Sequence, residues 1–255
     1  MSSEFEGPRT AIVTGGARRI GAAICRALAA RGWHLLIHCR TSRDEAAALA
    51  AELGNSKVVS VDLADPSAAE TIFGAAAALP PPRLLVNNAS RFSYDSADDF
   101  SAADWDAHQT VNVRAPALLS QRFVQGCSDG GGGLIVNLLD AKLAHPNPDF
   151  FSYTISKMAL AGLTELMARA CGARRIRVCG IAPSVTLLSG RQSVTNFEAM
   201  HRLNLLERGV SVDDIVRALA FIIDTPTLTG QTITLDGGQR FLGLARDVQF
   251  LEQQG

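Results

Sequence analysis

The chain has 255 residues, 47% of them hydrophobic and 19% charged, which is enough apolar material for the buried core of one large α/β domain. Its formal net charge of -1 and pI near 6.5 provide no broad attraction for nucleic acid or an anionic membrane, so we expect neither as a partner. The first ten residues are acidic and polar and no run of 18 apolar residues occurs, so we expect a cytoplasmic protein.

The first unit along the chain is a strand, a glycine turn and a helix. Residues 10–14 form an apolar, β-branched run that ends at Gly15, and apolar residues then recur at helical spacing. Such a turn presents free amide groups and the positive end of a helix dipole to an anion, and glycine lets a phosphate approach the backbone. The stretch T-G-G-A-R-R-I-G at residues 14–21 therefore indicates dinucleotide binding, but a glycine-rich turn alone is a weak signal.

The next expected strand, residues 33–38, leads into Cys39, Arg40, Thr41 and Ser42 and not into an acidic residue. A ribose 2'-hydroxyl is usually held by Asp or Glu at this place, whereas a 2'-phosphate is accommodated by arginine and hydroxyl donors. An isolated arginine is more often a solvated loop cation. The place of Arg40 directly after the second strand instead favours NADP over NAD.

Helices and strands continue to alternate after this βαβ unit. We expect helices over residues 42–53 and 66–80, and strands over residues 57–61 and 84–86. The last of these strands leads into N-N-A-S at 87–90, and ligands of open α/β sheets bind at the carboxyl ends of the strands. Phe92 lies just beyond. An aromatic residue there more often packs within a loop, and the alternative is that it covers a flat heterocycle.

The second half of the chain repeats the alternation. We expect a helix over 101–125, a flexible connector at 130–133, a strand over 134–139, a helix over 151–171 and a strand over 176–181. Residues 184–210 are expected to form a mobile flap over a site. A helix then begins with a capping box at Ser211 and runs to Ile223, and a closing strand and turn occupy 232–238.

The segment 137–157 contains the most informative side chains. In the helix expected from residue 151, Tyr153 and Lys157 stand at positions i and i+4 and project from one face. A phenol of pKa about 10 keeps its proton at neutral pH, and a neighbouring ammonium stabilises the phenolate that remains after proton transfer. Tyr153 is thus a candidate general acid. Asn112, on the preceding helix, either satisfies buried hydrogen bonds, which is the default, or holds a water near Lys157.

No metal site is expected. The five cysteines are odd in number and show no C-x-x-C, which fits reduced thiols better than a disulfide framework or a zinc site. The five histidines form no H-E-x-x-H or other compact ligand set.

Together these motifs resemble the short-chain dehydrogenase/reductase family. The shared motifs are T-G-x-x-x-R-x-G at 14–21, Asp62, N-N-A-S at 87–90, Asn112, Y-x-x-x-K at 153–157 and D-G-G at 236–238. The resemblance spans nearly the whole chain. It implies a single Rossmann-type, doubly wound α/β domain over residues 1–255 with a mainly parallel seven-stranded sheet, a nicotinamide cofactor, and a homo-oligomer for which a tetramer is favoured.

Two departures from the family pattern resemble the pteridine reductases. Arg19 stands where a middle glycine is usual, and Asp140 stands where the catalytic serine is usual. The C-R-T after the second strand, I-A-P-S at 181–184 and L-D-G-G at 235–238 are similar to the bacterial dihydromonapterin reductase branch.

The resemblance also implies roles for individual residues. The implied cofactor-binding residues are Gly15, Arg18, Arg19, Ile20, His38, Arg40, Thr41, Asp62, Leu63, Asn88, Ala89, Ser90, Tyr153, Lys157, Pro183 and Ser184. The implied substrate-binding residues are Arg19, Ser90, Phe92, Asp140 and Tyr153, with Phe92 stacking a pterin against the nicotinamide. The implied catalytic residues are Asp140, Tyr153, Lys157 and Asn112.

The carboxylate of Asp140 leads to a substrate hypothesis. An anion beside Tyr153 raises the pKa of the phenol and disfavours an alkoxide-like transition state, whereas reduction of a pterin C=N needs a proton on nitrogen that an Asp/Tyr pair can relay. We expect NADPH-dependent reduction of a dihydropterin, with dihydromonapterin favoured and dihydrobiopterin or dihydrofolate as further candidates. The alternatives are a generic NADP-linked carbonyl reductase of the same family and a non-catalytic NADP-binding regulator.

Overall fold

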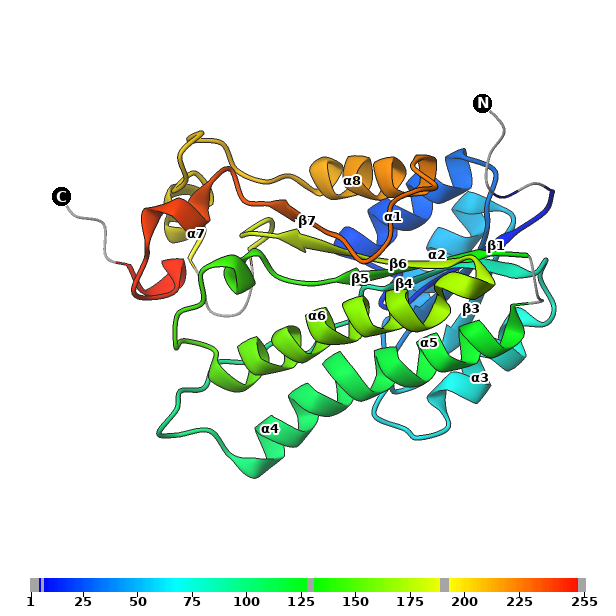
Figure 1. The fold of residues 1–255 in the computed structure, drawn as a ribbon, viewed down its shortest axis with the longest axis horizontal. Coiled ribbons are helices and arrows are strands. Elements are labelled where there is room, and N and C mark those ends of the chain that lie inside the picture. The colour runs from blue at the N-terminus through cyan, green and yellow to red at the C-terminus, as the bar shows by residue number, and fades with distance from the viewer. Residues whose placement is uncertain (1–4, 6, 128–130, 189–192, 252–255) are drawn as a thin grey trace.

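Seven short apolar runs form the strands of one sheet in the computed structural model, which describes residues 5, 7–127, 131–188 and 193–251 (Figure 1). The strands are β1 (Thr10–Val13), β2 (His34–Cys39), β3 (Ser56–Ser60), β4 (Pro82–Asn87), β5 (Gly133–Leu138), β6 (Ile176–Pro183) and β7 (Thr232–Leu235). Their order is β3-β2-β1-β4-β5-β6-β7, and each neighbouring pair is parallel. The expected Rossmann-type, doubly wound α/β fold is confirmed.

Helices cover both faces of the sheet (Figure 1). They are α1 (Arg19–Ala30), α2 (Arg43–Leu53), α3 (Ala68–Ala76), α4 (Ala102–Gln109), α5 (Ala115–Gly126), α6 (Phe151–Cys171), α7 (Val194–His201) and α8 (Val212–Asp224). Successive side chains of a strand point to opposite faces, so Ala11 and Val13 of β1 pack in a core with α1, α2 and α8. Ile12 between them packs in a second core with α3, α5 and α6. Both faces of the sheet are therefore buried, as in other all-parallel sheets.

The sheet order reverses its direction beside β1. The chain runs outward from β1 to β2 and β3, then returns to place β4 on the other side of β1 and runs outward again to β7. The crossover connections leave a crevice at the carboxyl ends of β1 and β4, which is where open α/β sheets bind ligands. The glycine turn after β1 and the N-N-A-S stretch after β4 both reach this crevice.

The helix expected over residues 101–125 is interrupted. A π-helical turn, η1 (Thr110–Arg114), separates α4 from α5, and Asn112 lies inside this turn with 1% of its surface exposed. Such turns often occur where a side chain has a specific role. The buried Asn112 amide, which apolar periodicity alone does not register, lies at the interruption.

Two expected segments lie partly outside the described residues. The connector at 130–133 includes Gly130, and the flap at 184–210 includes residues 189–192. Within the rest of the flap, α7 forms and buries Met200. The loop therefore contains a short helix with a buried apolar side chain.

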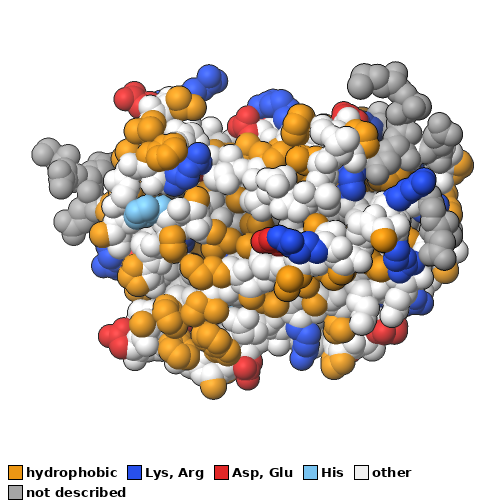
Figure 2. All heavy atoms as spheres, viewed as in Figure 1, with side chains coloured by type: hydrophobic (Ala, Val, Ile, Leu, Met, Phe, Trp, Pro, Cys, Tyr) orange, Lys and Arg blue, Asp and Glu red, His pale blue; other side chains and the backbone are white. Residues whose placement is uncertain are grey.

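Charged side chains of both signs are scattered among hydrophobic ones on the face shown in Figure 2, in keeping with the net charge of -1. None of the described helices has the length and apolar character needed to span a bilayer.

Gly21 is required at the start of α1 because the chain packs tightly there. An added Cβ would lie 2.1 Å from the Gly15 carbonyl oxygen and 2.8 Å from Gly16 Cα, both of them backbone atoms. We predict that Gly21→Ala lowers the free energy of unfolding by at least about 2 kcal/mol. Gly162→Ala is the control: it lies exposed within α6 with no atom within 4 Å of the added Cβ, and should stabilise by about 0.5–1 kcal/mol. Urea unfolding of both variants tests this, and a Gly21→Ala variant as stable as the wild type would contradict it.

Candidate active site

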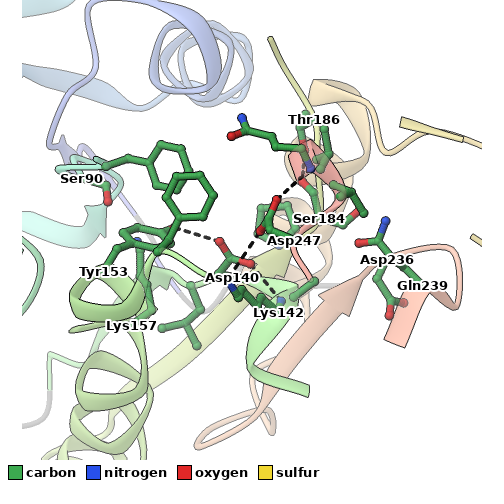
Figure 3. A pocket seen from close by; sticks show the side chains of 18 of the residues that line it. Ser90, Asp140, Lys142, Tyr153, Lys157, Ser184, Thr186, Asp236, Gln239 and Asp247 are labelled. Carbon is green, nitrogen blue, oxygen red and sulfur yellow. Dashed lines mark hydrogen bonds and ion pairs between the residues drawn. The ribbon is translucent and has the colours of Figure 1, made fainter. Parts of the chain in front are cut away.

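A pocket of about 490 Å³ lies at the carboxyl ends of the central strands. Ser90 follows β4, Asp140 follows β5, and Ser184 follows β6, so three neighbouring strands each deliver a polar side chain to the same edge. Tyr153 and Lys157 reach the pocket from α6 (Figure 3). Of the predicted site residues, the pocket lining contains Arg19, Ile20, Asn88, Ser90, Phe92, Asp140, Tyr153, Lys157, Pro183 and Ser184.

Tyr153 and Asp140 are directly hydrogen-bonded. The phenol Oη donates to Asp140 Oδ2 over 2.8 Å, and the other carboxylate oxygen, Oδ1, accepts from the backbone N of Lys142 over 2.9 Å. Burial, together with the adjacent Asp140 carboxylate, raises the pKa of Tyr153 well above its ordinary value. Tyr153 therefore keeps its proton at neutral pH, and that proton points at a carboxylate.

Lys157 lies one helical turn from Tyr153 and is equally buried, as the i, i+4 spacing predicted. Its Nζ donates to the carbonyl oxygen of Leu138 over 2.7 Å and lies 5.7 Å from the centroid of the Tyr153 ring. Only 3% of the residue is exposed. Burial lowers the pKa of Lys157 from 10.5 to about 8, and the negative charge of Asp140 opposes that shift. Lys157 is thus a cation near neutral pH, held behind the phenol.

Asn112 has its hydrogen-bonding capacity filled by protein atoms. Its Oδ1 accepts from the backbone N of Arg91 over 2.8 Å and from Ser90 Oγ over 3.2 Å. Its Nδ2 donates to the Arg91 carbonyl oxygen over 3.0 Å and to Ser156 Oγ over 2.9 Å. Two donors and two acceptor sites are all that an amide side chain offers. These contacts support the default role, positioning of the Ser90–Arg91 segment, while a role in holding water stays a prediction.

The glycine turn after β1 is shaped by contacts from behind. Gly15 has a φ of +60°, and a Cβ there would lie 3.1 Å from Ala89 Cα, so only glycine fits without strain. Asn88 Nδ2 donates to the carbonyl oxygens of Thr14 and Gly15 over 2.8 and 3.1 Å. Asn88 thus ties the end of β4 to the turn after β1.

His38, predicted among the cofactor-binding residues, is 2% exposed and lies behind the turn. Its Nδ1 accepts from the backbone N of Gly15 over 3.2 Å, and its Nε2 lies 3.0 Å from the Val61 carbonyl oxygen. Burial lowers the pKa of His38 and so favours the neutral ring that can do both. The His38 ring thus supports the backbone of Gly15, and its part in cofactor binding stays a prediction.

The basic residues predicted for the cofactor lie on the surface around the turn. Arg18 is exposed and forms an ion pair with Glu45 at 3.5 Å, while Arg40 and Thr41 are exposed at the end of β2. Arg19 donates to the Leu188 carbonyl oxygen over 2.8 Å and has a φ of +52°. A left-handed conformation costs a non-glycine residue roughly 1 kcal/mol or more. The chain therefore tolerates strain to place a guanidinium at the rim of the pocket.

The two residues predicted to contact adenine differ in exposure. Asp62 is exposed and its carboxylate accepts from the backbone N of Ala64 over 2.9 Å, whereas Leu63 is buried in the core beside α3. The Leu63 side chain therefore faces the protein interior, and a contact with a ligand there would involve the backbone.

Phe92 lies at the mouth of the pocket in an aromatic group. Its ring stacks on Phe150 at a centroid distance of 4.4 Å and meets the Tyr153 ring edge-on at 4.7 Å. With 40% of the residue exposed, part of the ring remains open to the pocket. Both alternatives raised for this residue are compatible with this position: loop packing on one side and a surface for a flat ring on the other.

A group of pocket residues was not found from the sequence. Lys142 lies two residues after Asp140, in the short helix η2 (Ala141–Ala144), and its Nζ is 3.5 Å from Asp247 Oδ2. Asp149 anchors the same C-terminal segment, because its carboxylate accepts from Arg246 Nε over 2.8 Å and from the backbone N of Asp247 over 2.7 Å. These pairs join residues about a hundred positions apart, and no local pattern indicates them.

The sequence and the fold of this chain are similar to those of described enzymes. The family described as short chain dehydrogenase matches residues 9–199. L-xylulose reductase from Mesocricetus auratus is 32% identical over 240 residues, which cover 90% of this chain and 96% of that protein. Pteridine reductase 1 from Leishmania tarentolae is 28% identical over 275 residues, covering 89% and 95% of the two chains. The crystal structure of FolM Alternative dihydrofolate reductase 1 from Brucella suis in complex with NADP has a TM-score of 0.87 and 39% identity, covering 91% of this chain and 95% of that one.

The buried ammonium of Lys157 should make the stability of the ligand-free protein depend on pH. The folded state loses this proton near pH 8 and the unfolded state keeps it to about 10.5, so at this residue the unfolded state binds more protons between these values and the Lys157 contribution to stability rises with pH. Tyr153 and the buried thiols of Cys25, Cys127 and Cys171, whose pKa values burial raises, act in the opposite sense at alkaline pH, so the Lys157 contribution is read as the difference between the wild type and a variant without this lysine. From pH 8 to pH 10 we expect a contribution of about 1–2 kcal/mol from Lys157.

Urea unfolding at both pH values measures this contribution. Lys157→Met should remove it, whereas Lys57→Met, at an exposed lysine on β3, should behave as the wild type. An equal change of stability from pH 8 to pH 10 in the wild type and in Lys157→Met would show that the buried ammonium makes no such contribution.

Proposed function

The chain belongs to the short chain dehydrogenase family, and we propose that it uses NADPH to reduce a dihydropterin to the tetrahydro form, with dihydromonapterin as the favoured substrate. The observation that carries this proposal is the 2.8 Å hydrogen bond from Tyr153 to Asp140 at the pocket wall. The relationship to NADP-bound FolM and to pteridine reductase 1 supports it.

The turn after β1 and the end of β2 fit an NADP-type cofactor. Gly15 takes a φ of +60° in a turn before a helix, where glycine lets a phosphate approach the backbone, and Arg40 with Thr41 stands exposed where an acidic residue would repel a 2'-phosphate. When bound, the cofactor supplies the hydride. Arg18, Arg40 and Thr41 would hold the 2'-phosphate and Arg19 the pyrophosphate. Asp62 and Leu63 would contact adenine, Lys157 the nicotinamide ribose, and Asn88, Ala89, Ser90, Pro183 and Ser184 the nicotinamide side.

The Tyr153–Asp140 pair suits protonation of a ring nitrogen. Reduction of C=N adds a hydride to carbon and a proton to nitrogen, and the proton on Tyr153 Oη is already shared with a carboxylate that can relay it. Lys157 behind the phenol offsets the negative charge that remains. A ketone would instead develop negative charge on oxygen near Asp140, which is electrostatically unfavourable.

Three cations of the pocket wall on the side of the C-terminal segment favour a substrate with an uncharged side chain there. Arg246 is bound by Asp149, Arg240 by Asp236 at 2.9 Å, and Lys142 faces Asp247. Each of these three cations thus has a carboxylate partner within the protein. A substrate carboxylate, as in a folate glutamate, would compete with those partners, whereas hydroxyl groups can bond to them without separating charges. This supports a pterin with a small hydroxylated side chain over a folate.

The second candidate is a carbonyl reductase, which the 32% identity to L-xylulose reductase favours. The two candidates differ at Asp140. We predict that Asp140→Ser lowers kcat/KM for a dihydropterin by about 10²–10⁴-fold, because the proton relay is lost, and leaves turnover of simple ketones unchanged or raised. Asp106→Ser, at an exposed position on α4, is the control. NADPH oxidation against a panel of pterins, folates and ketones is the measurement. A wild-type enzyme that turns over ketones alone would overturn the pterin assignment.

Arg40 is predicted to select NADPH over NADH. Arg40→Asp places a negative charge beside the site of the 2'-phosphate, so the ratio of kcat/KM for NADPH to that for NADH should fall at least about tenfold, equivalent to about 1.4 kcal/mol. Arg122→Asp, on the exposed side of α5, should leave the ratio unchanged. If the ratio were unaltered in Arg40→Asp as well, another residue would have to read the phosphate.

A further inference from the structure

A buried ion pair lies on the side of Asp140 opposite Tyr153 (Figure 3). Lys142 has a side chain only 9% exposed, and its Nζ lies 3.5 Å from Asp247 Oδ2 and donates to the Asp149 carbonyl oxygen. The Asp247 side chain is 20% exposed. Burying two charged side chains in a pocket wall costs free energy even when they pair. Apolar side chains could line the pocket without this cost, so the pair has a role beyond lining it.

The ion pair is connected to Asp140 through both geometry and charge. The backbone N of Lys142 donates to Asp140 Oδ1 over 2.9 Å, so the residue that bears the ammonium also holds the carboxylate in place. Its side chain interacts electrostatically with Asp140, and the Asp140 charge contributes to raising the pKa of Asp247, although burial is the larger cause. Lys142 thus interacts with three carboxylates, those of Asp247, Asp140 and Asp149.

The ionisable groups that act on Asp140 come from three directions. Tyr153 and Lys157 approach from α6, Lys142 from η2, and Asp247 from the C-terminal segment before η5 (Val248–Phe250). The pocket lining also contains the ionisable side chains of Arg19, His145, Asp236, Arg240 and Arg246. On the side of Asp140 away from α6, the positive charge of Lys142 and the negative charge of Asp247 act on the ionisation of Asp140 in opposite senses.

We propose that Lys142 and Asp247 are positioning residues for the proton transfer: the Lys142 backbone holds the Asp140 carboxylate beside Tyr153, and the ion pair next to it sets how readily Asp140 accepts a proton. This proposal rests on the dihydropterin reduction described above and extends it to the supply of the proton. It assigns the residues that adjust Asp140, neither of which needs to touch the substrate.

The two members of the pair should have opposite effects. Loss of the Lys142 ammonium leaves the Asp140 and Asp247 carboxylates facing each other without a cation, which favours protonation of Asp140. Loss of the Asp247 charge removes the carboxylate that acts most strongly on the Lys142 ammonium, so the ammonium acts more fully on Asp140 and favours its ionised form. A residue that merely fastened the C-terminal segment would not produce opposite movements, because either loss would loosen the same contact.

The test is the pH dependence of kcat/KM for a dihydropterin with saturating NADPH, because this profile reports the ionisation of essential groups in the cofactor-bound enzyme. The relay needs an ionised Asp140 to accept the Tyr153 proton, so activity falls at low pH as Asp140 becomes protonated. We expect this acid limb of the profile to move to higher pH by about one unit in Lys142→Met and to lower pH in Asp247→Asn. Lys142→Arg keeps the charge and should restore the wild-type limb. Lys57→Met, which removes an exposed lysine, is the control and should have no effect.

The outcomes separate this proposal from the function on which it rests. A wild-type enzyme that reduces no dihydropterin refutes the proposed function and this inference with it. Normal wild-type turnover with an acid limb that stays in place, or moves in the same direction in both variants, refutes the positioning role alone. Thermal unfolding of each variant identifies any that fail to fold. If Lys142→Met fails, Lys142→Gln and the near-isosteric Asp247→Asn make the same comparison.

Discussion

The hydrogen bond between Tyr153 Oη and Asp140 Oδ2 is the contact on which the site depends. It requires β5 to deliver Asp140 at its carboxyl end and α6 to begin where Tyr153 faces it. The start of α6 is fixed by Asp95, whose carboxylate accepts from the backbone N of Ser152 over 3.0 Å and from the Ser152 hydroxyl. Because Asp95 and Phe92 belong to the same loop after β4, one set of contacts positions the proton donor and the exposed aromatic ring together.

Charge balance explains why a buried site of this kind is tolerable. Isolated charges are costly in a protein interior, whereas paired and hydrogen-bonded ones are affordable. Two lysines flank the Tyr153–Asp140 pair: Lys157 behind the phenol and Lys142 beyond the carboxylate. Burial lowers the pKa of both ammonium groups, and Asp140 opposes this in each case. Asp140 therefore stabilises two cations while it accepts the proton of Tyr153.

Local patterns were sufficient for the fold and for the centre of the site. Alternating apolar runs marked the strands, their carboxyl ends marked the position of Asp140, and helical spacing placed Tyr153 and Lys157 on one face. They failed where a contact joins distant parts of the chain. The ion pair between Lys142 and Asp247 spans 105 positions, and His38, which ends a strand in the sequence pattern, turns inward to hold Gly15. Neither the folding of the C-terminal segment over the pocket nor the π-helical turn has a periodic signal.

A structure of the complex with NADP⁺ and a dihydropterin is the most direct test of the central claim, which is that the Tyr153–Asp140 pair protonates a ring nitrogen. The account predicts that Tyr153 Oη or an Asp140 oxygen lies within about 2.6–3.2 Å, directly or through one water, of the nitrogen bonded to the carbon that faces the nicotinamide. A pterin bound with Asp140 against its side chain, and with that ring nitrogen out of reach of both groups, would contradict it.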